Sequence, residues 1–286
     1  MADSSAKPSF VSPRVLTALI GMPIVALIVQ RGAVLFFAVV LVLALLGVRE
    51  IAAALRPLPQ STADSIFESR QNTAVPICIL EWPALIAVAA ILAAAQLLPP
   101  AKVLWGGAGA IVIVPLTIGV LRFGSARAVS LAGVALTWGA IGYCGLFAFL
   151  ILLRARGVDW FWLLLLGVWS SDIGAYYAGR AWGKTKLTPL SPGKTREGLI
   201  AGIVLAAIVC TAVGGQTRLG APIGLALGAL IGVCSPFGDL VESFWKREIG
   251  VKDLGTLLPG HGGVLDRCDS LIFTAWAVYL ASLWLH

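Results

Sequence analysis

The densest group of ionisable residues lies between two apolar segments in the last third of the chain. It reads GDLVESFWKREIGVKDLGTLLPGHGGVLDRCDS and covers residues 238–270. Asp239, Glu242 and Lys246 fall at i, i+3 and i+7, which is one face of a helix. Because ionisable groups at the edge of a membrane span are costly, such a cluster indicates function.

Two carboxylates from different helices could hold a hard metal ion in this stretch. Asp266 and Asp269 are spaced i, i+3 at the mouth of the last apolar segment. With cations beside them, Asp239 and Asp266 suit Mg²⁺ carrying a polyphosphate, and the absence of Cys or His clusters favours Mg²⁺ over zinc. His261, between two glycines, is better suited to a polar contact with substrate or a neighbouring Asp. For any one acid alone, the alternative is a salt bridge between helix ends.

A second polar cluster, SSDIGAYYAGRAWGKTKLTPLSPGKTREG, covers residues 170–198. Asp172, Tyr176 and Arg180 are spaced i, i+4 and i+8, so we expect them on one helical face. Cations and small residues dominate the remainder. The alternative to a substrate site is a loop whose Lys and Arg residues reflect only membrane topology.

Ser followed by Pro occurs in both clusters, at Ser191–Pro192 and Ser235–Pro236. This pair is typical of a helix N-cap and first helical residue, so we expect helices to begin at both places. Lys194 and Thr195 would then lie in a first helical turn, where unpaired backbone N–H groups favour phosphate.

The elements that position these clusters are predicted to be membrane helices. The chain is 59% hydrophobic and 12% charged, and its mean hydropathy is +0.93. We therefore expect an all-α, polytopic integral membrane protein that forms a single membrane domain over residues 1–286. Residues 1–169 would be an N-terminal multi-span region and residues 170–286 a catalytic region. The predicted spans number about nine: Val15–Gln30, Ala33–Val48, Trp82–Leu98, Val103–Leu121, Ala128–Leu153, Trp160–Tyr177, Leu199–Val213, Leu219–Phe237 and Leu271–Leu285.

The distribution of basic residues predicts the orientation. If the N-terminus is cytoplasmic, all but five of the 21 Lys and Arg residues lie on the cytoplasmic side, the exceptions being Arg31, Lys102, Arg154, Arg156 and Arg218. Both polar clusters then form cytoplasmic active-site loops of an inner or plasma membrane protein. The net charge of +7 is explained in this way, so we expect no nucleic acid partner. The segment Glu50–Pro76 is interpreted as a solvated connector or a surface helix, without chemistry.

The segment SFWKREIGVKDLGTLLPGHGGVLDRCDS resembles the signature of phosphatidate cytidylyltransferases, in which S-x-x-K-R is followed by K-D, P-x-H-G-G and D-R-x-D. The pieces SDIGAYYAGR, SPGKTREG and SPFGD also resemble that family, in the same order. The resemblance covers roughly residues 170–270. Cys268 departs from the usual aliphatic residue, and the link from Lys186 to Ser191 is one residue short.

The resemblance implies the reaction of CTP with phosphatidic acid to give CDP-diacylglycerol and pyrophosphate. It implies Mg²⁺ on Asp239 and Asp266, and it leaves open whether a monovalent cation shares the site. The other implied catalytic positions are Lys246, Arg247, Lys252, Asp253, His261, Arg267 and Asp269. The implied nucleotide or phosphate contacts are Asp172, Ser191, Lys194, Thr195 and Ser235.

The implied partners are CTP, phosphatidic acid, the lipid bilayer and, in a homodimer, a second copy of the chain. No residue pattern marks a dimer interface. The alternatives are a CTP-dependent lipid kinase and a membrane transporter. The ionisable residues gather at one membrane face instead of being spread along several spans, which argues against a transporter.

Overall fold

The computed structural model describes residues 13–55, 77–100, 138–189, 191–251, 253–255 and 262–285. These ranges contain no β-strand, which confirms the all-α prediction; Lys186 and Thr195 form an isolated antiparallel bridge. The predicted span Val103–Leu121 and the first part of Ala128–Leu153 lie outside the described residues. The helices are α1 (Pro13–Arg31), α2 (Ala33–Leu55), α4 (Ile77–Leu97), the short π-helix η2 (Trp138–Tyr143), α7 (Phe147–Arg156), α8 (Val158–Trp182), α9 (Arg196–Gln216), α10 (Ala221–Ile249) and α11 (Leu265–Ser282).

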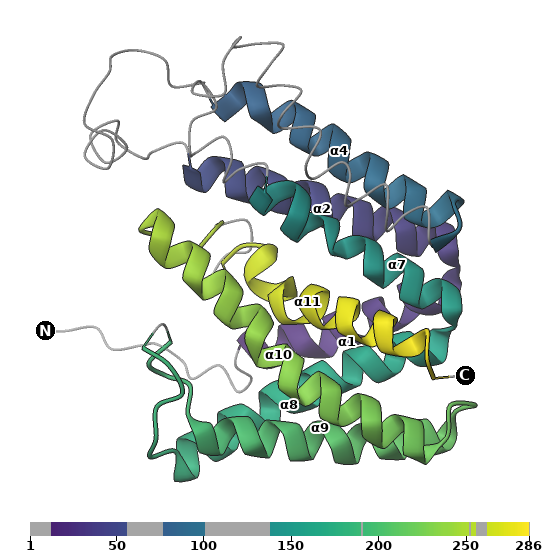
Figure 1. Ribbon diagram of the computed structural model, residues 1–286, viewed down its shortest axis with the longest axis vertical. Helices are drawn as coiled ribbons and strands as arrows, with labels where there is room; N and C mark the ends of the chain where they lie inside the picture. Colours follow the sequence, from purple (N-terminus) through teal and green to yellow (C-terminus); the bar gives the residue numbers. More distant parts are fainter. Residues whose placement is uncertain are drawn as a thin grey trace, which may run out of the picture.

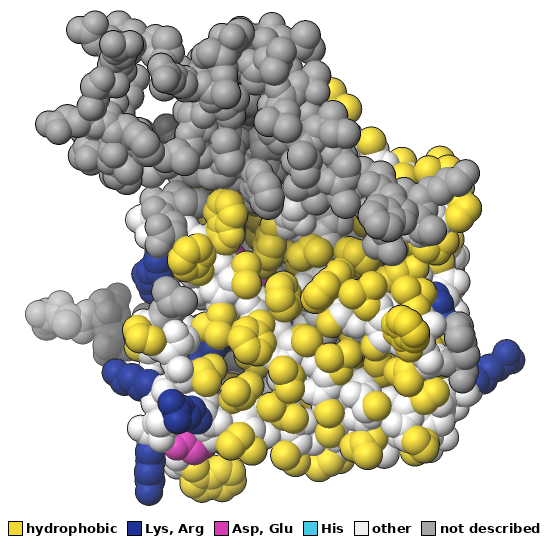
Figure 2. Space-filling model, in the orientation of Figure 1, with side chains coloured by type: hydrophobic (Ala, Val, Ile, Leu, Met, Phe, Trp, Pro, Cys, Tyr) yellow, Lys and Arg dark blue, Asp and Glu magenta, His cyan; other side chains and the backbone are white. Residues whose placement is uncertain are grey.

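Three helical stretches in these ranges are long and apolar enough to cross a membrane: Ala33–Ala54, Arg196–Gln216 and Ala221–Arg247. Their outer faces are apolar as well. On α9, Ile200, Val204 and Ile208 are more than half exposed at four-residue intervals, and hydrophobic side chains cover much of the face seen in Figure 2. An exposed apolar stripe of this kind suits contact with lipid. The prediction of a membrane protein is therefore supported, while the count of nine spans stays a prediction.

The helices are arranged in layers (Figure 1). α2, α4 and α7 lie together on one side, α8 and α9 lie antiparallel on the other, and α10 and α11 lie between them. The C-terminal ends of α2, α8 and α10 and the N-terminal ends of α9 and α11 all lie on the left of the view. Residues far apart in the sequence therefore meet at one end of the bundle.

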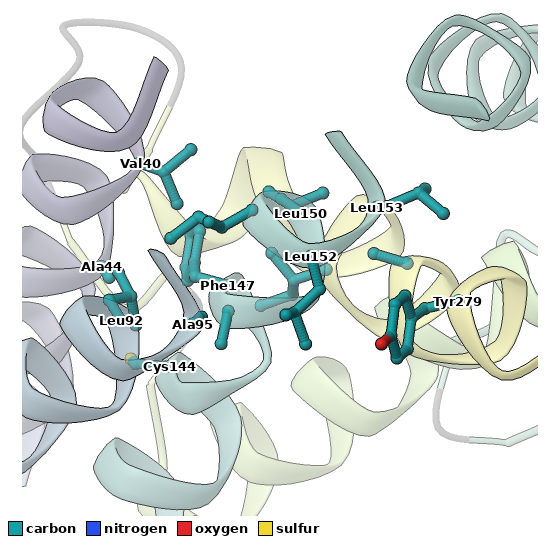
Figure 3. Close-up of a cluster of buried hydrophobic side chains, with 14 of the residues drawn as sticks. Val40, Ala44, Leu92, Ala95, Cys144, Phe147, Leu150, Leu152, Leu153 and Tyr279 are labelled. Carbon is teal, nitrogen blue, oxygen red and sulfur yellow. The ribbon is translucent and has the colours of Figure 1, made fainter. Parts of the chain in front are cut away.

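A hydrophobic core joins the early helices to the last one. Buried side chains from α2, α4, α7 and α11 converge in it, with Phe147 and Tyr279 among the largest. Figure 3 shows part of this cluster, with Val40, Ala44, Leu92, Ala95, Cys144, Phe147, Leu150, Leu152, Leu153 and Tyr279 labelled. The core fixes α11 relative to α2, which matters below because both helices carry carboxylates.

Glycines allow the later helices to approach one another closely. A Cβ atom at Gly202 of α9 would lie 2.8 Å from the Ser171 carbonyl oxygen of α8, and one at Gly228 of α10 would lie 2.6 Å from the Ala206 carbonyl oxygen of α9. A Cβ at Gly238 would lie 2.7 Å from the Asp269 carbonyl oxygen of α11. Small residues permit such packing between membrane helices. The close contact at Gly238 sets the spacing of α10 and α11, the two helices that carry the polar cluster.

Candidate active site

Lys246 joins the acidic face of α10 to the first turn of α11. As the spacing predicts, Asp239, Glu242 and Lys246 share one face of α10. The Lys246 ammonium lies 2.8 Å from Asp266 Oδ1 and 3.4 Å from Glu242 Oε1. The side chains of Glu242 and Asp266 are only 1% and 6% exposed, so the lysine neutralises acids that solvent hardly reaches.

The first two turns of α11 carry Asp266 and Asp269, as the sequence predicts. Asp266 Oδ2 accepts a hydrogen bond from the backbone N–H of Gly263 at 2.7 Å, and Asp269 Oδ1 accepts one from the N–H of Ser270 at 2.6 Å. Both carboxylates are thus held in fixed orientations. Asp269 is buried, and it lies close enough to Asp239 and Glu242 to interact with them electrostatically.

The loop between α8 and α9 contributes a second lysine. Lys194 Nζ lies 2.7 Å from Asp239 Oδ2 and donates a hydrogen bond to the Pro236 carbonyl oxygen at 3.1 Å. The loop is itself held to the start of α9, because the N–H of Leu187 donates to the Lys194 carbonyl oxygen and the N–H of Thr185 donates to Glu197. Lys194 is therefore presented to α10 on a braced loop.

The predicted helix start at Ser191–Pro192 is wrong. The N–H of Lys194 donates to the Ser191 carbonyl oxygen, which closes a turn, and α9 begins only at Arg196. Thr195 is its N-cap, with Oγ1 accepting a hydrogen bond from the N–H of Gly198 at 3.1 Å. Threonine is also a favoured N-cap residue, although the Ser-Pro pattern pointed to Ser191. Lys194 and Thr195 still lie at the N-terminal end of a helix.

The predicted helix start at Ser235–Pro236 is also wrong, because α10 runs through both residues without ending. Ser235 instead donates a hydrogen bond from its buried Oγ to Asp172 Oδ1 of α8 at 3.3 Å. Within α10, Ser243 Oγ donates to Asp239 Oδ1 at 3.1 Å. Asp172 and Ser235, both predicted substrate contacts, are therefore brought together beside Asp239 and Lys194. On the same face of α8, Arg180 donates to the Tyr176 hydroxyl at 3.2 Å, as their spacing predicts.

Glu50 was missed by sequence reasoning, which placed it at the start of a connector without chemistry. It lies in α2 and is 8% exposed, and its two carboxylate oxygens accept hydrogen bonds from the N–H groups of Val264 and Leu265 at 2.7 and 3.0 Å. The signal that could have found it is an acidic residue directly after a predicted span, where an unpaired charge would be costly.

The remaining predicted positions differ in how far the structure places them. Arg247 lies in the last turn of α10, Arg267 in the first turns of α11 and Asp253 between the two helices, all with exposed side chains. Their roles stay predictions. Lys252 and His261 lie outside the described residues.

The donor set fits a hard divalent cation that brings further ligands with it. Among the described residues, no three His, Cys, Asp or Glu side chains are grouped closely enough to form an all-protein metal cage. Mg²⁺ does not require one, since it is commonly bound by one or two carboxylates together with waters and substrate phosphates. Asp239 and Asp266 each already hold a lysine ammonium at 2.7–2.8 Å, which shows that both carboxylates attract cations.

Basic side chains gather at the same end of the bundle as these contacts. Lys and Arg side chains are concentrated at the left edge of Figure 2, where α8, α9 and α10 end or begin. The basic residues at the ends of α1 and α7 and between α9 and α10 lie at the opposite end: Arg31, Arg154, Arg156 and Arg218. The site is thus an anion-attracting end of the bundle with buried acids at its centre.

Comparison with known proteins identifies relatives of this chain. Proteins called phosphatidate cytidylyltransferase from Helicobacter pylori, Synechocystis sp. and Staphylococcus saprophyticus are 46%, 49% and 41% identical over 128, 116 and 138 residues. These matches cover 43%, 39% and 47% of this chain and 48%, 39% and 53% of the relatives, so the chain spans about half the length of the curated relatives it matches.

The wider family match covers nearly the whole sequence, from the first helix to the last. Residues 12–284 match the Cytidylyltransferase family. That range includes α8, the braced α8–α9 loop, α10 and α11, and therefore every described carboxylate and lysine of the site. The chain belongs to the Cytidylyltransferase family.

Proposed function

We propose that the chain is a phosphatidate cytidylyltransferase, which transfers the cytidylyl group of CTP to phosphatidic acid and releases pyrophosphate. The observation that carries the proposal is a set of two ion pairs, Lys194–Asp239 and Lys246–Asp266, contributed by one loop and two helices at the basic end of an apolar bundle. A reaction between a lipid phosphate and a nucleotide triphosphate needs such a place, where charge can be neutralised beside lipid.

Charge repulsion is the main obstacle to this reaction. At an effective dielectric constant of about 20, two unit charges about 5 Å apart repel by roughly 3 kcal/mol, and several such pairs meet when the two substrates approach. Lys194 and Lys246 supply ammonium groups that are paired with Asp239 and Asp266. An incoming phosphate would compete with these two carboxylates for the ammonium groups. Positioning and electrostatic stabilisation would therefore supply most of the catalysis.

In the proposed step, a phosphate oxygen of phosphatidic acid attacks the α-phosphorus of CTP. The bond from that phosphorus to the bridging oxygen breaks, and pyrophosphate leaves with the electron pair. No general base is required, because the phosphate nucleophile is already ionised. Asp239 and Asp266 are the residues that would hold Mg²⁺, which when bound would offset negative charge on the nucleotide phosphates. Ser243 and the N–H of Gly263 keep these two carboxylates oriented.

A test of the proposal follows radiolabel from CTP into lipid. The purified chain in detergent is given phosphatidic acid, Mg²⁺ and CTP labelled at either the α- or the γ-phosphate. We expect label in the organic-extractable product from α-labelled CTP only, and none when phosphatidic acid or Mg²⁺ is left out. Transfer from γ-labelled CTP would instead identify a lipid kinase. Transfer from neither, in a well-folded sample, would contradict both activities and favour a transporter.

We further infer that the basic end of the bundle faces the cytoplasm, where CTP is made. The support is the asymmetry of Lys and Arg between the two ends of the helices. Membrane vesicles of both orientations provide the test. Inverted vesicles are expected to use added CTP without permeabilisation, whereas right-side-out vesicles should require it. The opposite pattern would reverse the orientation. The homodimer stays a prediction.

A further inference from the structure

Glu50 connects the N-terminal part of the chain to the candidate active site through two short hydrogen bonds. Its Oε1 accepts from the N–H of Val264 at 2.7 Å and its Oε2 accepts from the N–H of Leu265 at 3.0 Å. These are consecutive backbone amides at the start of α11. A carboxylate that accepts two N–H groups at a helix N-terminus is held firmly, because the hydrogen bonds are charge-assisted and the helix dipole adds to them.

No side chain of α11 accepts the N–H groups of Val264 and Leu265. The N-cap residue Val264 has helical backbone angles and offers no capping side chain. The first N–H groups of a helix lack partners inside the helix and need them from elsewhere. Asp266 Oδ2 takes the N–H of Gly263, and Glu50 takes the two that follow. The first turn of α11 is thus held by two carboxylates, and one of them belongs to the candidate site.

The surroundings of Glu50 fit its carboxylate closely. A Cβ atom at Gly255 would lie 2.5 Å from Glu50 Oε1, and one at Gly263 would lie 2.6 Å from Oε2. One turn earlier on α2, a Cβ at Gly47 would lie 2.9 Å from the Leu265 side chain. Glycines at all three positions leave the space that the contact between α2 and the start of α11 occupies.

We propose that Glu50 is a positioning residue of the active site, which fixes the first turn of α11 and so sets where Asp266 and Asp269 stand. This rests on the proposed cytidylyl transfer. Leu265, whose N–H Glu50 holds, directly precedes Asp266, and Asp269 follows one turn later. A misplacement of about 1 Å in a catalytic group can lower a rate by about 10²-fold. Glu50 is buried and both its carboxylate oxygens are occupied by backbone N–H groups of α11, so its effect passes through these two aspartates.

The test uses Glu50→Gln in the full chain, with Asp159→Asn as the matched control. Asp159 is an acid in the first turn of α8, at the opposite end of the bundle from the candidate site. Glutamine keeps the size of the side chain but presents an NH₂ group to one of the two N–H donors. We expect kcat for CDP-diacylglycerol formation to fall about 10- to 100-fold, with the KM for phosphatidic acid little changed. Asp159→Asn should retain wild-type kcat.

Hydrogen exchange provides a readout that does not depend on catalysis. Amide exchange in peptides that contain Val264 and Leu265 should be faster in Glu50→Gln than in wild type, and unchanged in Asp159→Asn. Gly255→Ala is the second variant. Its added methyl group would push the Glu50 carboxylate away without removing it, so faster exchange and a lower kcat are expected again.

Three results would overturn the proposal. Unchanged exchange in Glu50→Gln and Gly255→Ala would mean that Glu50 does not hold the turn. Faster exchange with wild-type kcat would reduce Glu50 to a structural residue. A wild-type protein that folds but transfers no cytidylyl group would overturn the proposed function, and the catalytic part of this proposal with it. In that case the exchange data would still report on the Glu50 contact.

Discussion

Replacing Lys246 with methionine removes the ammonium group that joins α10 to α11. In the intact protein this group lies 2.8 Å from Asp266 Oδ1 and 3.4 Å from Glu242 Oε1. The two acidic side chains are 6% and 1% exposed, so water cannot replace the lost cation at either of them. Lys246→Met therefore leaves two largely buried carboxyl groups without this counter-charge.

The expected loss is large and depends on which partner is removed. Breaking a buried ion pair by deleting one member costs about 3–5 kcal/mol, which we expect for Lys246→Met. Asp266→Asn should cost less, about 1–2 kcal/mol, because the asparagine oxygen can still accept the Gly263 N–H and Lys246 retains Glu242. The double variant should be more stable than Lys246→Met alone, which requires a coupling free energy of about 2–3 kcal/mol, larger than the cost of Asp266→Asn.

Reversible unfolding in mixed micelles of dodecylmaltoside and dodecyl sulfate can measure these differences. The ten tryptophans of the chain provide the fluorescence signal. The free energy of unfolding is compared for wild type, each single variant and the double variant. Equal costs for Asp266→Asn and Lys246→Met would contradict the expected asymmetry. A double variant that recovers nothing would mean that the ion pair does not hold the two helices together.

Three further substitutions test other parts of the site. Asp239→Asn should abolish label transfer from CTP while the protein still folds and elutes like wild type, and Asp159→Asn should remain active; near-normal turnover of the first would contradict the metal assignment. Lys194→Met should raise the KM for CTP about 10- to 100-fold, which corresponds to a charge-assisted hydrogen bond of roughly 1.5–3 kcal/mol, and an unchanged KM would remove Lys194 from the phosphate site. Gly238→Ala should lower the free energy of unfolding by about 1–3 kcal/mol, because the added methyl group meets the backbone of α11 at Asp269; wild-type stability would show that the helices can separate freely.

Local spacing predicted the parts of the site that lie within one helix. The shared face of Asp239, Glu242 and Lys246 follows from helical periodicity, as does the pairing of Asp266 and Asp269 at the mouth of α11. The seven predicted spans in the described ranges each correspond to a helix, or to most of one, because apolar length is a strong signal.

Helix starts could not be predicted from Ser-Pro pairs. Proline is common in the first turn of a helix, but within membrane bundles it also occurs inside helices, where packing can compensate for the missing N–H. Pro236 belongs to the second kind. α10 is packed against α9 at Gly232 and against α11 at Gly238, so the helix continues on both sides of the proline. Only these tertiary contacts distinguish the two cases.

Contacts between residues far apart in the sequence could not be predicted either. Glu50 and Val264 are 214 positions apart, and nothing near Glu50 indicates a partner. Lys194 and Asp239 were each predicted as site residues, but their contact depends on how the α8–α9 loop folds back over α10. Residue type identified the participants in that second case, and the fold decided which of them meet.

Simultaneous assay of both products tests the proposed reaction most directly. The purified chain and its Asp239→Asn variant are supplied with CTP, phosphatidic acid and Mg²⁺, and pyrophosphate and CDP-diacylglycerol are quantified in the same reaction. We expect equal molar amounts of the two products from wild type and neither product from the variant. Pyrophosphate without the lipid product, or the same yield from Asp239→Asn, would contradict cytidylyl transfer at this site.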